Sequence, residues 1–343
     1  MDINLFDFLL PEELIAQKPA DKRDQSRLLA INYGEKTLRD EHFYDIIKYF
    51  QKGDVLVRNN TKVIPARLLG IKEKTGAHCE LLLLKQTINN DWECLCRPAK
   101  SLKIGSRVVF GNGELVAECV EEKEEGLRIF RFIYEGIFLE VLDKLGKMPL
   151  PPYIKKQITS NDRYQTVYAK FEGSAAAPTA GFHFTDEIFK ELIKSGVQIV
   201  DITLHIGLGT FRPVQVADTN DHLMHSELYE ISEESARLLN QAKENNKRII
   251  AVGTTTVRTL EANYSKYGYF KPTKESTNIF IQPGYKFKVV DALVTNFHLP
   301  KSTLLMLVSA FMDRDFTLLA YQHAVDEKYR FFSFGDGMFI YGK

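Results

Sequence analysis

The chain has 343 residues and a mass of 39.3 kDa, and its 45 basic and 45 acidic side chains give a formal net charge of zero. This length predicts two domains of about 100–200 residues each, and 44% hydrophobic with 26% charged residues excludes a disordered, collagenous or disulfide-scaffold chain. Zero net charge excludes a uniformly basic nucleic-acid-binding protein but allows a local basic face. Because no stretch approaches the ~20 apolar residues of a membrane span, no membrane partner is expected.

The N-terminal segment and the number of cysteines both indicate the compartment of the protein. The N-terminal segment MDINLFDFLLPEE carries acidic residues where a secretory signal peptide carries basic ones, so export is not expected. Four cysteines, at 79, 94, 96 and 119, are too few for a disulfide framework in a chain of this length. We therefore expect a cytoplasmic protein whose thiols stay reduced.

Residues 67–148 have a sequence pattern typical of an all-β segment. Short apolar runs such as LLGI, CELLLL, WECLC and RVVF are separated by Gly, Asn-Asp and Lys-Thr-Gly turn signals. Strands at this spacing predict an antiparallel sandwich or a small barrel. The prolines of MPLPPYI (148–154) suit neither a helix nor a central strand, so this segment is expected to be a stiff return linker.

On both sides of this segment, strands alternate with helices. Thr185 and Ser232 each precede a helical pattern, and VQIVDITLH (197–205) between them is a buried strand. The strand RIIAVG then leads into the helix TTTVRTLEANY. We predict a mixed α/β domain built from both chain ends, residues 1–66 and 149–343, with an inserted antiparallel β-barrel domain at residues 67–148.

The stretch GSAAAPTAGFHFT (173–185) is unusual because small residues surround a proline and a glycine just before a helix begins. Backbone N–H groups at such a point suit an anion or polar ligand, and Gly181 allows close approach. Thr179 and His183 add polar side chains. The alternative is a tight loop that only caps the following helix.

The stretch LHIGLGTFRPV (204–214) follows a buried strand, where ligands of α/β sheets gather. His205, Gly207, Gly209, Thr210 and Arg212 are therefore candidate site residues, and Arg212 could bind a carboxylate in a bidentate manner. The dinucleotide-binding fingerprint is absent, since the third glycine is missing and a proline forbids the helix that should follow. A plain glycine turn remains the alternative.

Further junctions repeat this combination of a turn, polar side chains and the start of an element. They are VGTTTVRTLE (252–261), NFHLPKSTLL (296–305) and YRFFSFGDGM (329–338), and they add the candidates Thr254, Thr255, Arg258, His298, Lys301, Ser302 and Asp336. Each alone is explained by a helix cap or a surface ion pair. Together, if one sheet gathers them, they predict a single pocket.

A metal site has weaker support. His222, His225 and Glu227 of HLMHSE could bind a hydrolytic metal, but the HExxH pattern is missing and a helix is only weakly introduced. Cys94 and Cys96 share one face of a strand without the spacing of a closed zinc site. We expect no metal, and buried thiols in the barrel.

Basic charge is concentrated in one half of the predicted barrel. Residues 58–107 carry a net charge of +6, while residues 108–148 carry −4. The peak is RPAKSLKIGSR (97–107), with Arg97, Lys100, Lys103 and Arg107. Small β-barrels often bind oligonucleotides, and such a face would attract a phosphate backbone. A solvated charged loop is the alternative.

Taken jointly, these stretches resemble a known family. With FDFLLPEELIAQKP, RDQSRLL and NNTKVIPARL near the N-terminus, they are similar to the S-adenosylmethionine:tRNA ribosyltransferase-isomerase family of queuosine biosynthesis, from Leu5 to Met338. Three positions depart from the expected pattern, with Phe182 in place of Leu, Lys62 in place of Arg and Gly337 in place of Ala. None of these departures removes a reactive group.

The resemblance implies an unusual use of S-adenosylmethionine as a co-substrate that donates its ribosyl carbons. The acceptor is the aminomethyl group of 7-aminomethyl-7-deazaguanine at the wobble position of tRNA with a GUN anticodon. Adenine and methionine leave, and epoxyqueuosine-tRNA forms. The family also implies a monomer.

The chemistry implied by this resemblance needs a base for the C5′ proton beside the sulfonium, and a neutral histidine suits this near pH 7. His183, His205 and His298 are the candidates. Arg212 or Arg258 could hold the methionine carboxylate, and Asp336 the amine or a ribose hydroxyl.

Two other classes of protein stay open. A methyltransferase would also use S-adenosylmethionine, but the usual glycine-rich loop after a first strand is absent. A non-catalytic RNA-binding module would explain the barrel but not the histidine-bearing junctions elsewhere.

Overall fold

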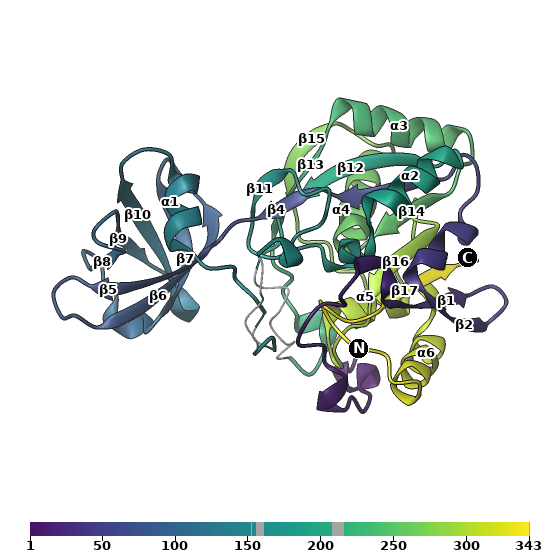
Figure 1. Cartoon of the computed structure of the whole chain (residues 1–343), viewed down its shortest axis with the longest axis horizontal. Coiled ribbons are helices and arrows are strands. Elements are labelled where there is room, and N and C mark those ends of the chain that lie inside the picture. The colour runs from purple at the N-terminus through teal and green to yellow at the C-terminus, as the bar shows by residue number, and fades with distance from the viewer. Residues whose placement is uncertain (152, 156–160, 208–215, 343) are drawn as a thin grey trace.

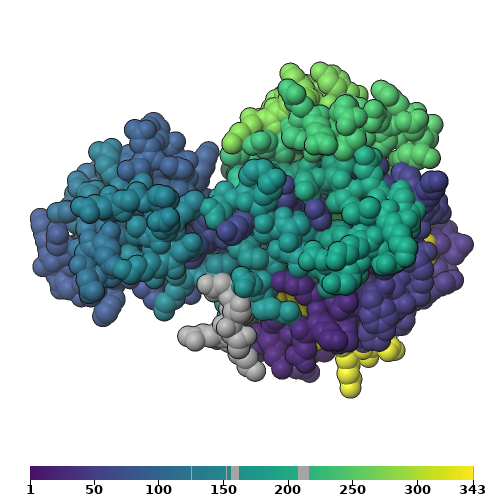
Figure 2. Space-filling view, turned by 45° about the horizontal axis from the view of Figure 1, so that its top comes forward, coloured from purple at the N-terminus to yellow at the C-terminus, as the bar shows by residue number. Residues whose placement is uncertain are grey.

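The computed structural model describes residues 1–151, 153–155, 161–207 and 216–342. A small barrel (left in Figure 1) joins a larger α/β body through a narrow neck, and both ends of the chain lie in the body. The space-filling view shows the same two lobes (Figure 2). The predicted fold class, a mixed α/β domain with an inserted antiparallel barrel, is confirmed. The exact boundaries at residues 66/67 and 148/149 stay a prediction.

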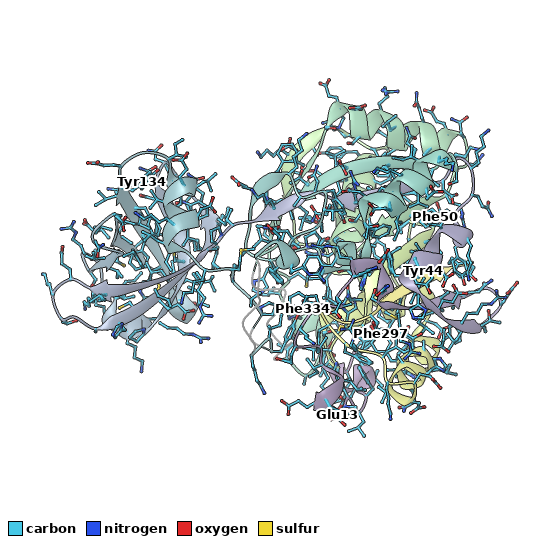
Figure 3. The ribbon with its side chains drawn as sticks, viewed as in Figure 1. Glu13, Tyr44, Phe50, Tyr134, Phe297 and Phe334 are labelled. Carbon is cyan, nitrogen blue, oxygen red and sulfur yellow. The ribbon has the colours of Figure 1, made fainter. Side chains whose placement is uncertain are left out.

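The inserted barrel is closed by antiparallel pairing in the order β10-β7-β6-β5-β8-β9. Its elements are β5 (Arg67–Lys72), β6 (His78–Gln86), β7 (Asp91–Arg97), β8 (Arg107–Phe110), β9 (Leu115–Glu122), β10 (Leu127–Tyr134) and α1 (Phe138–Leu145). Buried and part-exposed residues alternate along the strands, so inward side chains fill the barrel. The four cysteines are among these buried residues, as free thiols. Tyr134, labelled in Figure 3, ends the last strand.

The body is built on a nine-stranded sheet with the order β15-β13-β12-β3-β14-β16-β17-β1-β2. Its strands are β1 (Arg27–Asn32), β2 (Thr37–His42), β3 (Val55–Asn59), β12 (Gln198–Leu204), β13 (Glu227–Ile231), β14 (Ile249–Val252), β15 (Thr273–Thr277), β16 (Ala292–Asn296) and β17 (Gly337–Tyr341). The central strands β12, β3, β14 and β16 are mutually parallel. A separate parallel pair joins β4 (Thr61–Val63) to β11 (Phe171–Ser174).

Helices cover both faces of this sheet because the central strands are apolar on both sides. One face packs against α3 (Glu233–Glu244), α4 (Thr254–Tyr267), α5 (Thr303–Met312) and α6 (Arg314–Asp326). The other packs against α2 (Asp186–Lys194) and the 3-10 helix Phe43–Tyr49. Phe297, labelled in Figure 3, lies in the first of these two cores.

The helix starts predicted at Thr185 and Ser232 are confirmed by their caps, and Ser302 caps α5 in the same way. Thr185 accepts a hydrogen bond from the N–H of Ile188, Ser232 from that of Ser235, and Ser302 from that of Leu305. Each bond satisfies an N–H that the first helical turn leaves without a partner. These caps fix where each helix begins, and so where the preceding loop must lie.

The neck between body and barrel is a pair of adjacent chain segments. Arg67, which begins β5, pairs with Lys147 of the returning chain, and each N–H donates to the carbonyl of the other. A Cβ on Gly146 would lie 2.0 Å from the carbonyl oxygen of Pro65, so this close approach requires glycine. Entry and exit therefore lie side by side.

Candidate functional site

The carboxyl ends of the parallel strands gather the loops in which the sequence concentrates its polar residues. Because β3, β12, β14 and β16 run in one direction, the segments that follow them meet at one edge of the sheet. The segment before β17 joins them there, since β17 is antiparallel to β16 and Gly337 pairs with Asn296. Ala176 pairs with Ile206, which brings in the loop before α2.

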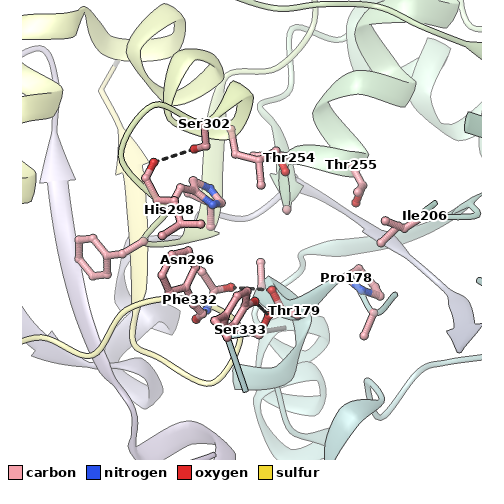
Figure 4. A pocket seen from close by; sticks show the side chains of 18 of the residues that line it. Pro178, Thr179, Ile206, Thr254, Thr255, Asn296, His298, Ser302, Phe332 and Ser333 are labelled. Atoms are coloured by element: carbon pink, nitrogen blue, oxygen red, sulfur yellow. Dashed lines mark hydrogen bonds between the residues drawn. The ribbon is translucent and has the colours of Figure 1, made fainter. Parts of the chain in front are cut away.

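A cavity of about 110 Å³ lies at this edge (Figure 4). Its walls come from segments widely separated in the sequence. They include Tyr153, Pro178, Thr179, Ile206, Thr254, Thr255, Asn296, Phe297, His298, Lys301, Ser302, Phe332 and Ser333. The junctions that seemed separate in the sequence thus line one pocket, whose walls are mostly apolar with a few convergent polar groups.

His298 lies in the cavity wall, two residues after the end of β16. Its Nε2 is 3.0 Å from the hydroxyl of Thr295, and its backbone N–H donates to the hydroxyl of Tyr321. Among the described residues, its Nδ1 has no hydrogen-bond partner. Burial lowers the pKa of His298 to about 3, so the ring is neutral at physiological pH.

His183 lies behind the cavity wall, and both of its ring nitrogens are used. Ser26 Oγ lies 2.7 Å from Nδ1 and donates to the carbonyl of Arg23, so Nδ1–H donates to this hydroxyl. Asn296 Nδ2 lies 3.2 Å from Nε2, which accepts. Burial, with the charges of Arg330 and Arg23, lowers the pKa of His183 to about 3.

Asn296 connects this histidine to the cavity. Its amide nitrogen also donates to the carbonyl of Phe332 at 3.1 Å, and its oxygen lies 3.4 Å from the hydroxyl of Thr179, as the dashed line in Figure 4 shows. Phe332 has a φ of 71°, a conformation that costs a bulky residue about 1–3 kcal/mol and is concentrated at functional sites. Asn296 is thereby held in one orientation.

The start of α4 supplies backbone donors to the cavity. Gly253, whose φ is 85°, turns the chain from β14 into the helix, and Thr254 and Thr255 follow in the cavity wall. The hydroxyl of Thr256 donates to the carbonyl of Val252 at the end of β14, and that of Thr259 donates to the carbonyl of Thr255. Asn59 Nδ2 lies 3.5 Å from the hydroxyl of Thr255. Such a helix start favours a negative charge or a hydroxyl oxygen.

Comparison with known proteins shows the family of the chain. A family model described as queuosine biosynthesis protein matches residues 3–340. The chain belongs to this family. Its fold is similar to the crystal structure of S-adenosylmethionine tRNA ribosyltransferase from Thermotoga maritima, with 38% sequence identity, a TM-score of 0.57, and coverage of 98% of this chain and 99% of that one. The family expected from the sequence motifs is thus confirmed.

In this member of the queuosine biosynthesis family, the cavity wall contains six of the residues proposed from the sequence. They are Thr179, Thr254, Thr255, His298, Lys301 and Ser302. Lys301 also forms an ion pair with Asp7 at 3.0 Å, and the hydroxyl of Ser302 donates to the carbonyl of Leu299.

Other proposed residues do not line the cavity and have partners of their own. The Nδ1 of His205 is 2.8 Å from the hydroxyl of Thr61, and burial, then the charge of Lys274, lowers the pKa of His205. Asp336 accepts from the backbone N–H groups of Arg27 and Arg330.

Arg258 lies within α4 in a buried ion pair with Glu227. The second carboxylate oxygen of Glu227 accepts from the N–H of Gly207 at 3.3 Å. The carboxylate of HLMHSE is therefore engaged by a cation and an amide, and the described residues contain no group of three or more His, Cys, Asp or Glu suited to a metal.

Gly181 belongs to the 3-10 helix Thr179–His183 beside the cavity. A Cβ there would lie 2.0 Å from the hydroxyl of Tyr168, so the glycine serves close packing rather than ligand approach. Gly209, Thr210 and Arg212 lie outside the described residues.

Sequence reasoning missed several residues of the wall. Asn296, Tyr153 and Phe332 were not proposed, although Tyr153 stacks on Phe332 with ring centroids 4.6 Å apart and bonds the hydroxyl of Ser333. The signal for Asn296 was its place at the end of a buried strand, two residues before His298.

The basic residues proposed for tRNA contact are all exposed on the barrel. Lys103 pairs with Glu122 and Arg107 with Glu73, whereas Arg97 and Lys100 have no ion pair among the described residues. Lys72 donates to the carbonyl of Ser101, so this segment lies by the end of β5 that is remote from the neck. Within the described part of the chain, no helix is long and apolar enough to cross a membrane.

Proposed function

We propose that this chain transfers and isomerises the ribosyl moiety of S-adenosylmethionine onto tRNA. The acceptor is the aminomethyl group of 7-aminomethyl-7-deazaguanine at the wobble position of a GUN anticodon, and the products are epoxyqueuosine-tRNA, adenine and methionine. The observation that carries this proposal is 38% identity to an S-adenosylmethionine tRNA ribosyltransferase over 98% of the chain.

The cavity has the chemistry that S-adenosylmethionine requires. Apolar walls from Pro178, Ile206 and Phe297 suit the adenine and ribose carbons, and the stacked Tyr153 and Phe332 offer ring faces to a sulfonium cation. The backbone N–H groups at the start of α4 would bind a hydroxyl or carboxylate oxygen.

We assign the role of general base to His298. It lines the cavity, its ring is neutral, and Nδ1 is available when Nε2–H donates to the hydroxyl of Thr295. The adjacent sulfonium acidifies the C5′ proton, which lets a weakly basic imidazole accept it. His205 is the second candidate, since it follows β12 beside Ile206.

His183 is a positioning residue in this proposal. Because both ring nitrogens hold Ser26 and Asn296, it has none left for a substrate proton, and it orients the Asn296 amide at the cavity instead. Among the residues predicted to bind the cofactor, we assign that role to the polar groups that line the cavity, including Thr179, Thr254 and Thr255.

The tRNA must reach this cavity while also meeting the barrel. We propose that Arg97, Lys100, Lys103 and Arg107 contact its phosphate backbone, which raises affinity without reading sequence. We also propose that the protein is a monomer in a reducing cytoplasm. The four buried free thiols fit that compartment.

Product analysis tests the proposal directly. The protein is incubated with S-adenosylmethionine and tRNA that carries the aminomethyl base, and small molecules are quantified by liquid chromatography. We expect adenine and methionine in equal amounts. S-adenosylhomocysteine with a methylated tRNA would show a methyltransferase instead, and no turnover would leave a binding module.

A further inference from the structure

A second, smaller pocket lies behind the cavity and carries two arginines that the proposed chemistry does not use. It has a volume of about 20 Å³ and is lined by Pro19, Ala20, Arg23, Ser26, Arg163, Phe182, His183, Ser333, Phe334 and Gly335. Phe334, one of its lining residues, is labelled in Figure 3. Ser333 lines both pockets, so they are separated by little more than one side chain.

The two guanidinium groups are held in place by backbone carbonyls. Arg23 donates to the carbonyls of Phe182 and Asp162, at 3.2 and 2.9 Å, and Arg163 donates to the carbonyl of Ala20. Among the described residues, neither guanidinium forms an ion pair with a carboxylate. Five fixed N–H donors per arginine therefore exceed the acceptors that the protein provides.

The charges around this pocket are mostly of one sign. The positive charge of Arg163, after burial, lowers the pKa of Arg23, and the charge of Asp162 opposes this. Arg330 contributes to the field at His183 but is already paired with Asp336. No residue that lines the pocket is acidic. Two guanidinium groups in a lining without an acidic residue favour an anion, and Asp162, outside the lining, offsets only part of their charge.

We propose that this pocket, the Arg23–Arg163 pocket, binds a phosphate group of the tRNA backbone next to the reacting nucleotide. Arginine forks match the geometry of a phosphate, and the hydroxyl of Ser333 can add a donor. The inference rests on the proposed function, because it names where that function's RNA substrate is held.

The other source of an oxyanion is the carboxylate of the methionine moiety. That carboxylate carries an ammonium group on the neighbouring carbon, which would find two guanidinium groups and no acidic residue in the pocket lining. A phosphodiester has no such positive charge. The lining therefore favours phosphate over the amino acid.

The test uses the full-length enzyme with Arg163→Gln, because Arg163 has fewer structural hydrogen bonds than Arg23. The matched control is Arg237→Gln, on the exposed face of α3, where the Arg237 side chain is hydrogen-bonded only to Gln241 among described residues. Binding of tRNA that carries 7-aminomethyl-7-deazaguanine is measured by fluorescence anisotropy at several salt concentrations. S-adenosylmethionine binding is measured by calorimetry without tRNA.

We expect Arg163→Gln to weaken tRNA binding about tenfold, as for the loss of a charged hydrogen bond. The salt dependence should flatten by about 0.7–0.9 of a unit, as for one lost phosphate contact. The affinity for S-adenosylmethionine should not change, Arg163→Lys should retain part of the tRNA affinity, and Arg237→Gln should match the wild type.

Unchanged tRNA affinity and salt slope in folded Arg163→Gln would overturn the proposal. A loss of S-adenosylmethionine affinity with normal tRNA binding would also overturn it and assign the pocket to the carboxylate. If Arg163→Gln fails to fold, Arg163→Lys decides by the same two measurements, with full tRNA affinity overturning the proposal. These binding results do not depend on turnover, so they are distinguishable from a failure of the proposed reaction, which product analysis shows with the wild type.

Discussion

Lowering the pH should leave two of the protein's eight histidines neutral where an ordinary histidine is charged. Burial sets the pKa of both His183 and His298 at about 3, against 6.5 for an exposed ring. At pH 5, an exposed ring is about 97% protonated, whereas a ring with a pKa near 3 is about 1% protonated. The two rings should therefore stay neutral across the whole physiological range.

The sign of the effect on stability follows from the same values. Between about pH 6.5 and pH 3, the unfolded chain binds a proton at each of these histidines and the folded chain does not, so stability falls as the pH falls through this window. From pH 7 to pH 5, each histidine should lower the free energy of unfolding by about 2 kcal/mol. This loss of stability arises because burial disfavours the charged ring in the folded state.

Nuclear magnetic resonance of the full-length protein with ¹³C-labelled histidine rings measures this directly. His183→Asn and His298→Gln identify the two signals, and the same rings in the urea-unfolded chain provide the reference titration. The two signals should show no titration between pH 7 and pH 5. A midpoint above about pH 5.5 for either ring in the folded protein would refute the burial argument.

Three further predictions concern the site and the barrel. His298→Asn should lower kcat about 10²- to 10⁴-fold while the protein stays folded and binds tRNA, because a general base is lost. Replacing Lys100, Lys103 and Arg107 together by Glu should weaken tRNA binding and flatten its salt dependence, while S-adenosylmethionine binding stays unchanged. Activity should survive exhaustive treatment with EDTA, since the chemistry proposed uses a protein base and no metal.

Each of these has a result that contradicts it. Near-normal kcat in His298→Asn would pass the role of base to His205, and His205→Asn is the companion variant. Unchanged tRNA affinity in the folded triple Glu variant would mean that the basic barrel segment is only solvated. Loss of activity with EDTA that zinc restores would return attention to the His222 and His225 segment.

Local signals in the sequence predicted the local structure well. Thr185 and Ser232 each predicted a helix start, because a capping hydroxyl acts within three residues. The alternation of short strands and turns predicted the barrel, because strand and turn preferences also act between residues close in the sequence. Gathering of the junctions at one sheet edge followed from the parallel strand pattern, since such strands end together.

The sequence could not assign roles within the site. His183 and His298 are both flanked by large apolar residues in the sequence, and only their tertiary partners distinguish them. His183 meets Ser26, 157 positions away, and Asn296, 113 positions away, and these contacts occupy both ring nitrogens. The pairing of Arg23 and Arg163 could likewise not be predicted, because no local pattern links two arginines that line one pocket only in the folded chain.

The paired neck has a consequence for the history and engineering of this fold. Because Arg67 and Lys147 are hydrogen-bonded neighbours, the 79 residues between them form a closed excursion whose ends already meet. Closing a loop of this length costs little more than closing a short one. The body could therefore gain, exchange or lose such a module by joining residues 66 and 148 through a tight turn, with its own sheet unbroken.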